Sequence, residues 1–324
     1  MKTLLVGYTA ADLFVRGKHG KKVTAPWLDD GVTCHCLDVY HRHAIEKTHH
    51  VRAVCAPHLP EGPWDVIRFK TGPKRMSGEL ALDQLQEIHL LMRRQTPPPK
   101  FELVFDGKER DRNALLEKIK DDPDRVRDFS ATWQASVPGL APIAFTSFPG
   151  CFCHRRQDEG GLALAEVVCR DLAARPAPAP VNLLDMGCGC GLVGLLVARA
   201  VKDVSLVGVD SHSRAIEAAN LNARNLGVEA EMILADSGTP ARMDGTFDVF
   251  VGNPPYYSDY RIADVFLETA KRALKPGGVC YTVCKNAAGL EPVQRRYFPD
   301  VEIVRRRGYA VLKSIKPVES RRRV

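Results

Sequence analysis

The sequence predicts an α/β protein whose second half is a mostly parallel sheet ending in an antiparallel hairpin. In that half, short apolar runs alternate with helical patterns, which is typical of a parallel sheet covered by helices on both faces. The last two apolar runs are joined by a short basic turn, which is typical of a hairpin. The first half repeats the alternation less regularly, so we expect a second, degenerate α/β domain there.

The elements of the second half follow from this alternation. The predicted strands are, in chain order, 181–187, 204–210, 230–236, 247–253 and 278–286. The predicted helices are 192–201, 213–225 and 262–274. The two hairpin strands are 301–304 and 309–316. Because helices separate the first five strands, these strands are expected to run parallel.

The first half is interpreted as a second copy of the same fold. Its predicted elements are strands 3–7, 32–39, 52–56, 64–70 and 101–107 and the helix 77–95. Segment 64–69 repeats the pattern of 247–252, but no glycine-rich loop follows its first strand. Since Asp122-Pro123-Asp124 interrupts the helical pattern, we place the boundary there and divide the chain into domains 1–128 and 129–324.

Composition and charge restrict the class of protein. The chain has 324 residues, 45% of them hydrophobic and 26% charged, which is typical of a globular protein. No apolar run approaches the roughly 20 residues that a membrane span needs, and Asp12 interrupts the apolar N-terminus, so we expect a cytoplasmic protein without a membrane partner. The net charge of +7, with basic clusters at 16–22, 305–307 and 321–323, permits a polyanionic partner.

The ten cysteines have a spacing that argues against disulfides and zinc. No C-x-x-C pair occurs among them. The cluster richest in potential zinc ligands is Cys34-His35-Cys36 with His41 and His43 nearby. Buried, reduced thiols are the preferred interpretation, and no metal is expected.

A glycine-rich segment follows the strand at 181–187. Glycines at a strand-to-helix turn let the backbone approach a ligand closely, and the helix N-terminus then faces that ligand. The candidate cofactor-binding residues in this segment are Asp185, Gly187, Cys188, Gly189 and Gly191. The segment also satisfies the dinucleotide fingerprint G-x-G-x-x-G, so a nucleotide-linked oxidoreductase stays an alternative.

Acidic residues close the next two strands. Asp210, followed by Ser211, stands where a carboxylate can accept hydrogen bonds from both ribose hydroxyl groups. Asp236, followed by Ser237, stands where a side chain can meet an adenine amino group. Helix capping would explain either aspartate alone. Glycines and two aspartates at three consecutive strand ends favour a nucleoside site.

The sequence Asn253-Pro254-Pro255-Tyr256 follows the fourth strand. Prolines turn the chain out of the sheet and hold its backbone rigidly. The Asn253 amide oxygen and the Pro254 carbonyl can then accept hydrogen bonds from one NH2 group and direct its lone pair toward a methyl donor, which is catalysis by orientation and electrostatics. Tyr256 provides a flat face for a flipped base. These four residues are the candidate catalytic residues, and Asn253 also borders the cofactor site.

The second half resembles class I S-adenosylmethionine-dependent methyltransferases. Within that class, it is similar to the small-subunit ribosomal RNA guanine-N2 methyltransferases and their large-subunit relatives. The residues that carry the resemblance are Phe148-Pro149-Gly150-Cys151-Phe152, Asp158-Glu159-Gly160, Asp185 through Gly191, Asp210, Asn222, Asn225, Asn253-Pro254-Pro255-Tyr256 and Leu274-Lys275-Pro276-Gly277-Gly278.

The resemblance implies a Rossmann-like methyltransferase fold over residues 129–324 and a degenerate methyltransferase-like domain over 1–128 that holds RNA. It also implies S-adenosyl-L-methionine as cofactor, guanine N2 as methyl acceptor, and ribosomal RNA or a ribosomal subunit as partner. It leaves the oligomeric state open. The chain departs from the family pattern at Gly161, where Ser or Thr is usual, and at Tyr256-Tyr257, where Phe-His is usual.

Other functions remain alternatives at this point. The sequence Asn-Pro-Pro-Tyr also occurs in adenine-N6 methyltransferases and in enzymes that methylate a glutamine amide of release factors. A non-enzymatic RNA-binding or assembly protein with a vestigial site is an alternative of another class. The retained glycines, aspartates and Asn253 argue against it, because a scaffold has no use for two acceptors directed at an NH2 group.

Overall fold

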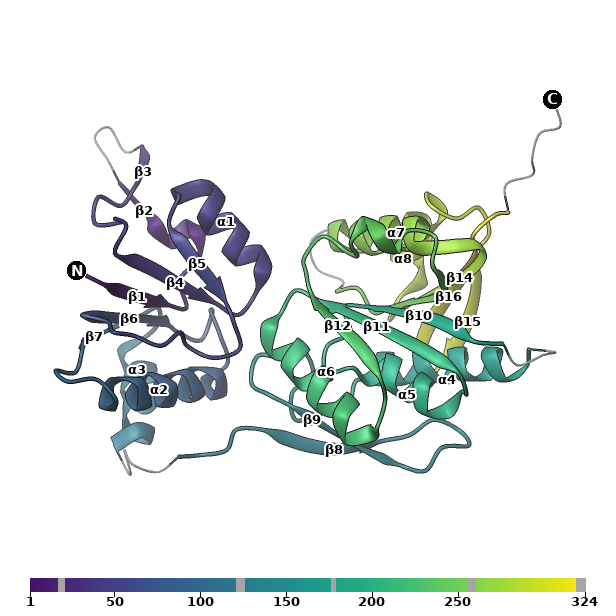
Figure 1. The fold of residues 1–324 in the computed structure, drawn as a ribbon, viewed down its shortest axis with the longest axis horizontal. Helices are drawn as coiled ribbons and strands as arrows, with labels where there is room; N and C mark the ends of the chain where they lie inside the picture. Colours follow the sequence, from purple (N-terminus) through teal and green to yellow (C-terminus); the bar gives the residue numbers. More distant parts are fainter. Residues whose placement is uncertain (17–20, 121–125, 176–178, 256–259, 319–324) are drawn as a thin grey trace. The chain divides into compact units, whose positions relative to one another are not determined.

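The computed structural model describes residues 1–16, 21–120, 126–175, 179–255 and 260–318, which form two compact units (Figure 1). The first unit comprises Met1–Ser130, Phe148–Gly150 and His212–Arg214. The second unit comprises Ala131–Ser147, Cys151–Ser211 and Ala215–Val324. Among the described residues, no helix has the length and apolar character needed to cross a membrane.

The second unit contains a seven-stranded sheet in its described part, with the order β12-β11-β10-β13-β14-β16-β15. The strands are β10 (Val181–Met186), β11 (Val204–Asp210), β12 (Ala230–Leu234), β13 (Phe247–Gly252), β14 (Leu274–Cys284), β15 (Glu302–Arg306) and β16 (Tyr309–Ile315). Strands β10 to β14 pair in parallel, whereas β16 pairs antiparallel with both β14 and β15. The predicted parallel sheet with a C-terminal hairpin is confirmed.

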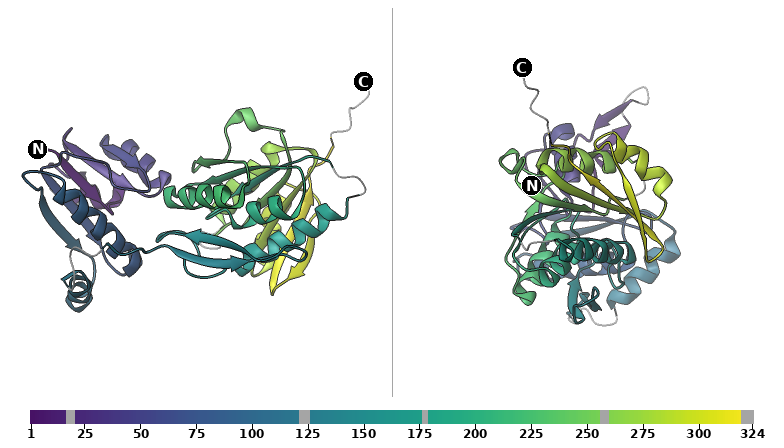
Figure 2. Two further views of the ribbon diagram at one scale, coloured as in Figure 1. Left: turned by 60° about the horizontal axis from the view of Figure 1, so that its bottom comes forward. Right: turned by 90° about the vertical axis from the view of Figure 1, so that its right-hand side faces the viewer.

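Helices cover both faces of this sheet (Figure 1 and Figure 2). One face carries α4 (Glu159–Ala173), α5 (Leu192–Ala200) and α6 (Ser213–Leu226), and the other carries α7 (Arg261–Ala273) and α8 (Ala287–Arg295). The unit also contains the short 3-10 helix η3 (Ala241–Met243) and an antiparallel pair, β8 (Ala131–Ala135) and β9 (Ile143–Ser147). The helices α4 and α8 and this antiparallel pair were not predicted from the sequence.

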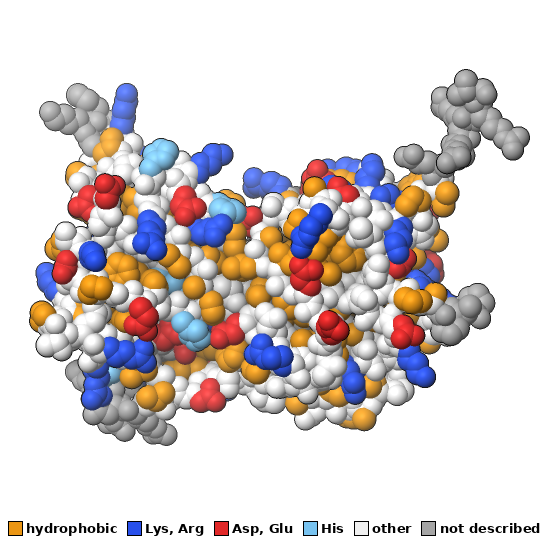
Figure 3. Space-filling view, viewed as in Figure 1, with side chains coloured by type: hydrophobic (Ala, Val, Ile, Leu, Met, Phe, Trp, Pro, Cys, Tyr) orange, Lys and Arg blue, Asp and Glu red, His pale blue; other side chains and the backbone are white. Residues whose placement is uncertain are grey.

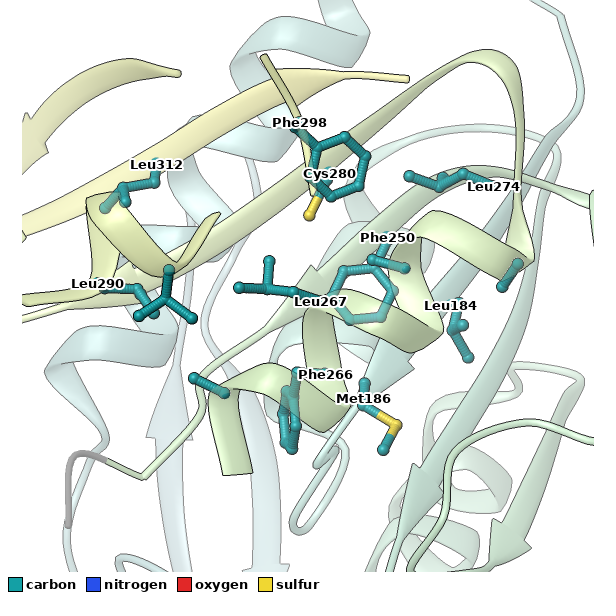
Figure 4. Packing of buried hydrophobic residues seen from close by; sticks show 14 of the residues in the cluster. Leu184, Met186, Phe250, Phe266, Leu267, Leu274, Cys280, Leu290, Phe298 and Leu312 are labelled. Atoms are coloured by element: carbon teal, nitrogen blue, oxygen red, sulfur yellow. The ribbon is translucent and has the colours of Figure 1, made fainter. Parts of the chain in front are cut away.

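The core between the sheet and α7 and α8 is fully apolar at its centre (Figure 4). Phe250 of β13 lies against Phe266 and Leu267 of α7, and Leu290 of α8 closes the same cluster. Residues three or four apart share one face of a helix, which is why α7 presents its apolar residues together. Burying each such side chain contributes about 1.5–3 kcal/mol. This packing fixes the position of β13, whose end carries the candidate catalytic asparagine.

The first unit contains a five-stranded parallel sheet in the order β5-β4-β1-β6-β7. Its strands are β1 (Thr3–Val6), β4 (Val32–Cys36), β5 (Arg52–Cys55), β6 (Val66–Thr71) and β7 (Lys100–Phe105). Its helices are α1 (Val39–His49), α2 (Gly78–Arg93) and α3 (Glu109–Lys120), and its smaller elements are η1 (Ala10–Leu13), β2 (Phe14–Arg16) and β3 (Lys22–Thr24). Leu4 packs with α2 and Leu5 with α1, because successive strand residues point to opposite faces.

The strand order of the first unit repeats that of β12 to β14 in the second, so the degenerate second copy of the fold is present. The structure corrects one predicted strand and adds the helices α1 and α3, which were not predicted. The predicted strand 32–39 ends at Cys36, because the Asp38 side chain accepts a hydrogen bond from the Tyr40 N–H and begins helix α1. Helix α1 was not predicted because few of its residues are apolar.

None of the ten cysteines, all of which lie in the described part of the chain, forms a disulfide. Burial raises the pKa of Cys34 and Cys36 to about 12, which keeps both protonated and unreactive at neutral pH. No group of three or more His, Cys, Asp or Glu side chains that could hold a metal ion occurs within the described ranges.

Candidate active site

The candidate residues gather at one edge of the seven-stranded sheet. Met186 of β10 pairs with Val209 of β11 on one side and Gly252 of β13 on the other. Parallel strands that are in register end at the same edge of a sheet, which is where open α/β sheets bind ligands. The glycine-rich loop, Asp210 and Asn253 therefore lie at the same edge.

The glycine-rich loop has a backbone that favours glycine. Gly187, Gly189 and Gly191 have φ angles of +68°, +56° and +85°, all in the left-handed region. The Gly189 N–H donates to Asp210 Oδ2 at 2.9 Å, which ties the loop to β11. A Cβ atom added at Gly189 would meet nothing within 4 Å. The loop thus presents bare backbone to open space beside a carboxylate.

Asp185 lies beneath the loop. It is 2% exposed, and its Oδ2 accepts a hydrogen bond of 2.9 Å from the Gly194 N–H in the first turn of α5. Burial raises the pKa of Asp185 to about 7, and the negative charge of Asp210 adds to the shift. The hydrogen bond shows that Asp185 anchors α5, while its contact with a cofactor remains a prediction.

The other predicted cofactor-binding residues border the loop. Cys188 is buried, and its sulfur would lie 3.2 Å from a Cβ at Gly208, so it fills space under the loop. Asp210 pairs with Leu234 at the end of β12, and the segment after β12 carries a half-buried Asp236 and an exposed Ser237. Ser211 is half-buried.

Asn253 stands immediately after β13 and is half-buried. Its Nδ2 donates a hydrogen bond of 2.8 Å to Oδ2 of Asp158. Pro254 is buried and Pro255 half-buried, so the turn out of the sheet is packed in place. Tyr256, the predicted stacking residue, lies outside the described residues.

Asp158 is a site residue whose role the sequence interpretation did not identify. It is the N-cap of α4, and its Oδ1 accepts a hydrogen bond of 3.0 Å from the Gly160 N–H. Burial raises its pKa, although hydrogen bonds from Gly161, Asn253 and Gly160 oppose this effect. An aspartate before a helix is a capping signal, but its contact with Asn253 spans 95 positions, which no local pattern reveals.

An aromatic ring and a lysine flank this aspartate. A Cβ at Gly160 would lie 3.2 Å from the ring of Tyr309, so the ring packs directly on the start of α4. Lys285 Nζ lies 4.4 Å from the centroid of that ring. A cation–π contact thus holds Lys285 over the ring and adds a positive charge near the start of α4.

The basic turn at 305–307 is partly neutralised by acidic side chains. Arg306 and Arg307 both donate to Glu166, which is 6% exposed. Arg307 also pairs with Glu159 at 2.8 Å. These contacts fasten the β15–β16 hairpin to α4, so two of the three arginines have a structural role. On the face drawn in Figure 3, positive and negative side chains are interspersed.

The first unit carries an ion-pair cluster at the position that the glycine-rich loop occupies in the second unit. Asp12, in the 3-10 helix after β1, accepts hydrogen bonds from Arg75 at 2.5 Å and from Lys70 of β6 at 2.7 Å. Burial alone would raise the pKa of Asp12, but the two cations hold it below its usual value. This cluster joins the ends of β1 and β6 in place of a glycine-rich loop.

Comparisons with known proteins agree with this architecture. Residues 142–313 match the family described as the methyltransferase small domain. The ribosomal RNA small subunit methyltransferase C of Haemophilus influenzae is 24% identical over 59% of this chain and 56% of its own length. The ribosomal RNA large subunit methyltransferase G of Streptomyces avermitilis is 30% identical over 60% of this chain and 52% of its own. The chain thus spans about half the length of these curated relatives.

A solved structure extends the likeness in fold to nearly the whole chain. The T. thermophilus 16S rRNA N2 methyltransferase in complex with AdoMet and guanosine superimposes with a TM-score of 0.73. The superposition covers 98% of this chain and 88% of that one, at 17% sequence identity. At this identity the match concerns the fold, which includes both units.

Proposed function

Because the chain belongs to the methyltransferase small domain family, we propose that it transfers a methyl group from S-adenosylmethionine to guanine N2 of ribosomal RNA. The observation that carries the proposal is the position of Asn253. It follows β13, beside the glycine-rich loop of the neighbouring strand β10, and its amide is held by Asp158. An amide oxygen next to a cofactor loop is suited to hold an amino group for transfer.

The residues around the loop fit the proposed cofactor. Bare backbone at Gly189 faces open space, and the Asp210 carboxylate lies at the same loop. Asp210 would hold the ribose, Asp236 the adenine, and the backbone of the loop the amino-acid portion. When bound, S-adenosylmethionine supplies a methyl group that leaves sulfur, with the bonding pair staying on sulfur, as the new N–C bond forms.

The chain's own contribution is to orient the nucleophile. The lone pair of an exocyclic amino group is delocalised into the base and is a poor nucleophile. Asn253 Oδ1 and the Pro254 carbonyl would accept its two hydrogens, which favours a pyramidal nitrogen with its lone pair directed at the methyl group. The surplus proton is released to water, so a strong base is not required.

The proposed substrate rests on the named activities of the relatives. Both relatives are named as ribosomal RNA methyltransferases, and the superimposed structure is that of an N2 methyltransferase. The positive charge of Lys285, which lies over the Tyr309 ring near the start of α4, is compatible with RNA. We further propose that domain 129–324 is catalytic and that domain 1–128 holds RNA. A ribosomal substrate places the enzyme in the cytoplasm.

The test is single-turnover transfer from labelled S-adenosylmethionine to ribosomal subunits from cells that lack the gene, with the product nucleoside identified by mass spectrometry. Wild type should yield N2-methylguanosine. Asn253→Ala should lower the rate by roughly a hundredfold or more, the scale for a preorganised polar contact. Its affinity for S-adenosylmethionine should stay near wild type, because the amide faces the nucleophile.

The matched control is Asn220→Ala. Asn220 lies on α6 and donates to the Ile216 carbonyl within its own helix. The substitution removes the same amide away from the site, so transfer should be unchanged. If Asn253→Ala transferred at the wild-type rate, the amino-group mechanism would be wrong. A different methylated nucleoside would refute the choice of guanine N2.

A further inference from the structure

We propose that Asp158 is the positioning residue of the transfer site, because its carboxylate holds the Asn253 amide with Oδ1 toward the target amino group. The inference rests on the proposed function and deepens it. An amide offers an acceptor and a donor of nearly the same shape, and a half-turn about its last bond exchanges them. Only one of the two orientations can receive the hydrogens of an NH2 group.

The geometry around Asp158 selects that orientation. An ionised carboxylate only accepts hydrogen bonds, so the amide end that faces it must be Nδ2. That contact is 2.8 Å long. The second carboxylate oxygen is held at 3.0 Å by the Gly160 N–H at the start of α4. Asp158 is therefore fixed by the helix and in turn fixes Asn253.

The residue at position 161 makes room for this carboxylate. A Cβ at Gly161 would lie 2.7 Å from Asp158 Oδ2, the same oxygen that accepts from Asn253. A side chain at 161 and this hydrogen bond therefore compete for the same space. Gly161 has an ordinary helical backbone, so the effect of a side chain at this position comes from the close approach of Asp158, whose carboxylate would have to shift, and not from a φ angle.

The consequence is selectivity for an NH2 nucleophile. With Nδ2 turned toward Asp158, Asn253 directs its acceptor Oδ1 toward the target, and the Pro254 carbonyl is a second acceptor. A primary amine has two hydrogens to match them. A hydroxyl group has one hydrogen and leaves one acceptor without a donor, which is costly in a partly buried site.

An exchange of the two side chains tests the inference. In Asp158→Asn, the Oδ1 atom of the new amide keeps its hydrogen bond from the Gly160 N–H, so the new NH2 group faces Asn253. The Asn253 amide must then turn, with Oδ1 toward position 158 and Nδ2 toward the target amino group. In Asn253→Asp, two carboxylates face each other and repel at pH 8. In the double variant, the new amide at position 158 donates to the new carboxylate at position 253, whose other oxygen again faces the target.

Single-turnover transfer to ribosomal subunits at pH 8 is the measurement, made on the full chain. Asp158→Asn should be slower than wild type by roughly a hundredfold. The double variant should be at least about tenfold faster than Asp158→Asn, which is the coupling expected of residues in direct contact. The affinity for S-adenosylmethionine should stay within about threefold, because the change affects the transfer step.

Two further variants separate positioning from helix capping. Asp158→Ser keeps an N-cap acceptor but is too short to reach Asn253, so it should be about as slow as Asp158→Asn while melting near wild type. Asp171→Asn makes the same substitution on the same helix at a residue that pairs with Lys313, and should transfer at the wild-type rate. Wild-type transfer by Asp158→Asn or Asp158→Ser, or a double variant no faster than Asp158→Asn, would overturn the inference.

A spectroscopic readout keeps the inference testable without transfer. With selective ¹⁵N-asparagine labelling, the Asn253 NH2 signal is the one that is missing from Asn253→Asp. It should move upfield in Asp158→Ser, because a hydrogen bond to a carboxylate is lost. An unchanged signal would refute the inference, whereas an absence of transfer by wild type would refute the proposed function alone.

Discussion

Asp185 is a carboxyl group buried under the glycine-rich loop, where it accepts a hydrogen bond from the Gly194 N–H. Charging a buried carboxylate is costly, and this cost is what raises its pKa to about 7. The group therefore gains a proton on folding between its usual pKa of 3.8 and about 7. Such a group makes the stability of the fold depend on pH in that window.

The sign of this dependence follows from proton linkage. Between about pH 4 and 7 the folded chain binds a proton that the unfolded chain does not, so the free energy of unfolding falls as pH rises and levels off above about pH 7. The effect should amount to a few kcal/mol, since one pKa unit corresponds to about 1.4 kcal/mol. Asp185→Asn, which stays neutral, should lack this component.

Urea unfolding of wild type and Asp185→Asn at pH 5 and pH 8 checks the prediction. The variant should gain stability relative to wild type on going from pH 5 to pH 8. Other titrating groups, such as the buried His35, are common to both proteins and cancel in the difference. An identical pH dependence in the two proteins would contradict the raised pKa of Asp185.

At the scale of elements, the glycine-rich loop combines two requirements. Gly189 needs glycine for its positive φ angle, and it also faces open space where the cofactor is proposed to bind. Gly227, at the end of α6, has a similar φ of +61° and the same open space around it, but it precedes β12 and therefore lies at the opposite edge of the sheet from the loop. Substitution at both positions therefore distinguishes the effect of backbone strain, which the two glycines share, from the effect of ligand contact, which is proposed for Gly189 alone.

We predict different consequences for Gly189→Ala and Gly227→Ala. Each should lower the free energy of unfolding by about 1 kcal/mol, the cost of a left-handed alanine. Gly189→Ala should also weaken S-adenosylmethionine binding by at least about tenfold, because the methyl group enters the ligand space. Calorimetry on both variants is the measurement. Equal affinities would show that the loop does not contact the cofactor.

Ion pairs fasten the β15–β16 hairpin to helix α4. Glu166 of α4 is nearly buried, and its carboxylate accepts hydrogen bonds from both Arg306 and Arg307. Pairing a nearly buried carboxylate with two guanidinium groups offsets the cost of its burial. The hairpin also carries Tyr309, so this contact helps to place the ring on Gly160.

At the scale of the whole molecule, two units with the same strand order differ in the residues at the ends of their strands. The second unit keeps bare glycines and an asparagine at its strand ends. In the first unit, Asp12, Lys70 and Arg75 pair with one another at the equivalent edge. Gly7, the glycine that follows β1, is packed against the Lys70 carbonyl, so it presents no bare backbone to a nucleoside. We therefore expect the first unit to contribute to substrate binding and not to cofactor binding.

Truncation to residues 129–324 tests this division of roles. The truncated chain retains every predicted cofactor residue, so calorimetry should give an affinity for S-adenosylmethionine within about threefold of the full chain. Its transfer to ribosomal subunits at low substrate concentration should fall by at least about tenfold, because RNA affinity depends on the number of phosphate contacts. A thermal melt establishes that the truncated chain is folded. Full transfer by such a chain would exclude a substrate-holding role for residues 1–128.

The sequence by itself determined that the second unit contains a mostly parallel sheet with a C-terminal hairpin, and it placed the carboxyl ends of the strands to within two residues. The predicted strand 204–210 has the bounds of β11, because its mainly apolar residues stand between polar segments that are typical of turns. The predicted strand 278–286 begins four residues after the start of β14, since Leu274-Lys275-Pro276-Gly277 is typical of a turn. Helix α1 is absent from the prediction because a mostly polar helix lacks the apolar periodicity that identifies one.

Only the tertiary structure decided how the site residues interact. The sequence predicts Asp185 at the cofactor, and the fold places its carboxylate against the Gly194 N–H beneath the loop. The arginines of the hairpin turn could have faced solvent or RNA, and two of them pair with Glu166. Asp158 meets Asn253 across 95 positions. Periodicity and motifs report on neighbours along the chain, whereas hydrogen bonds between distant side chains depend on how helices and sheet pack.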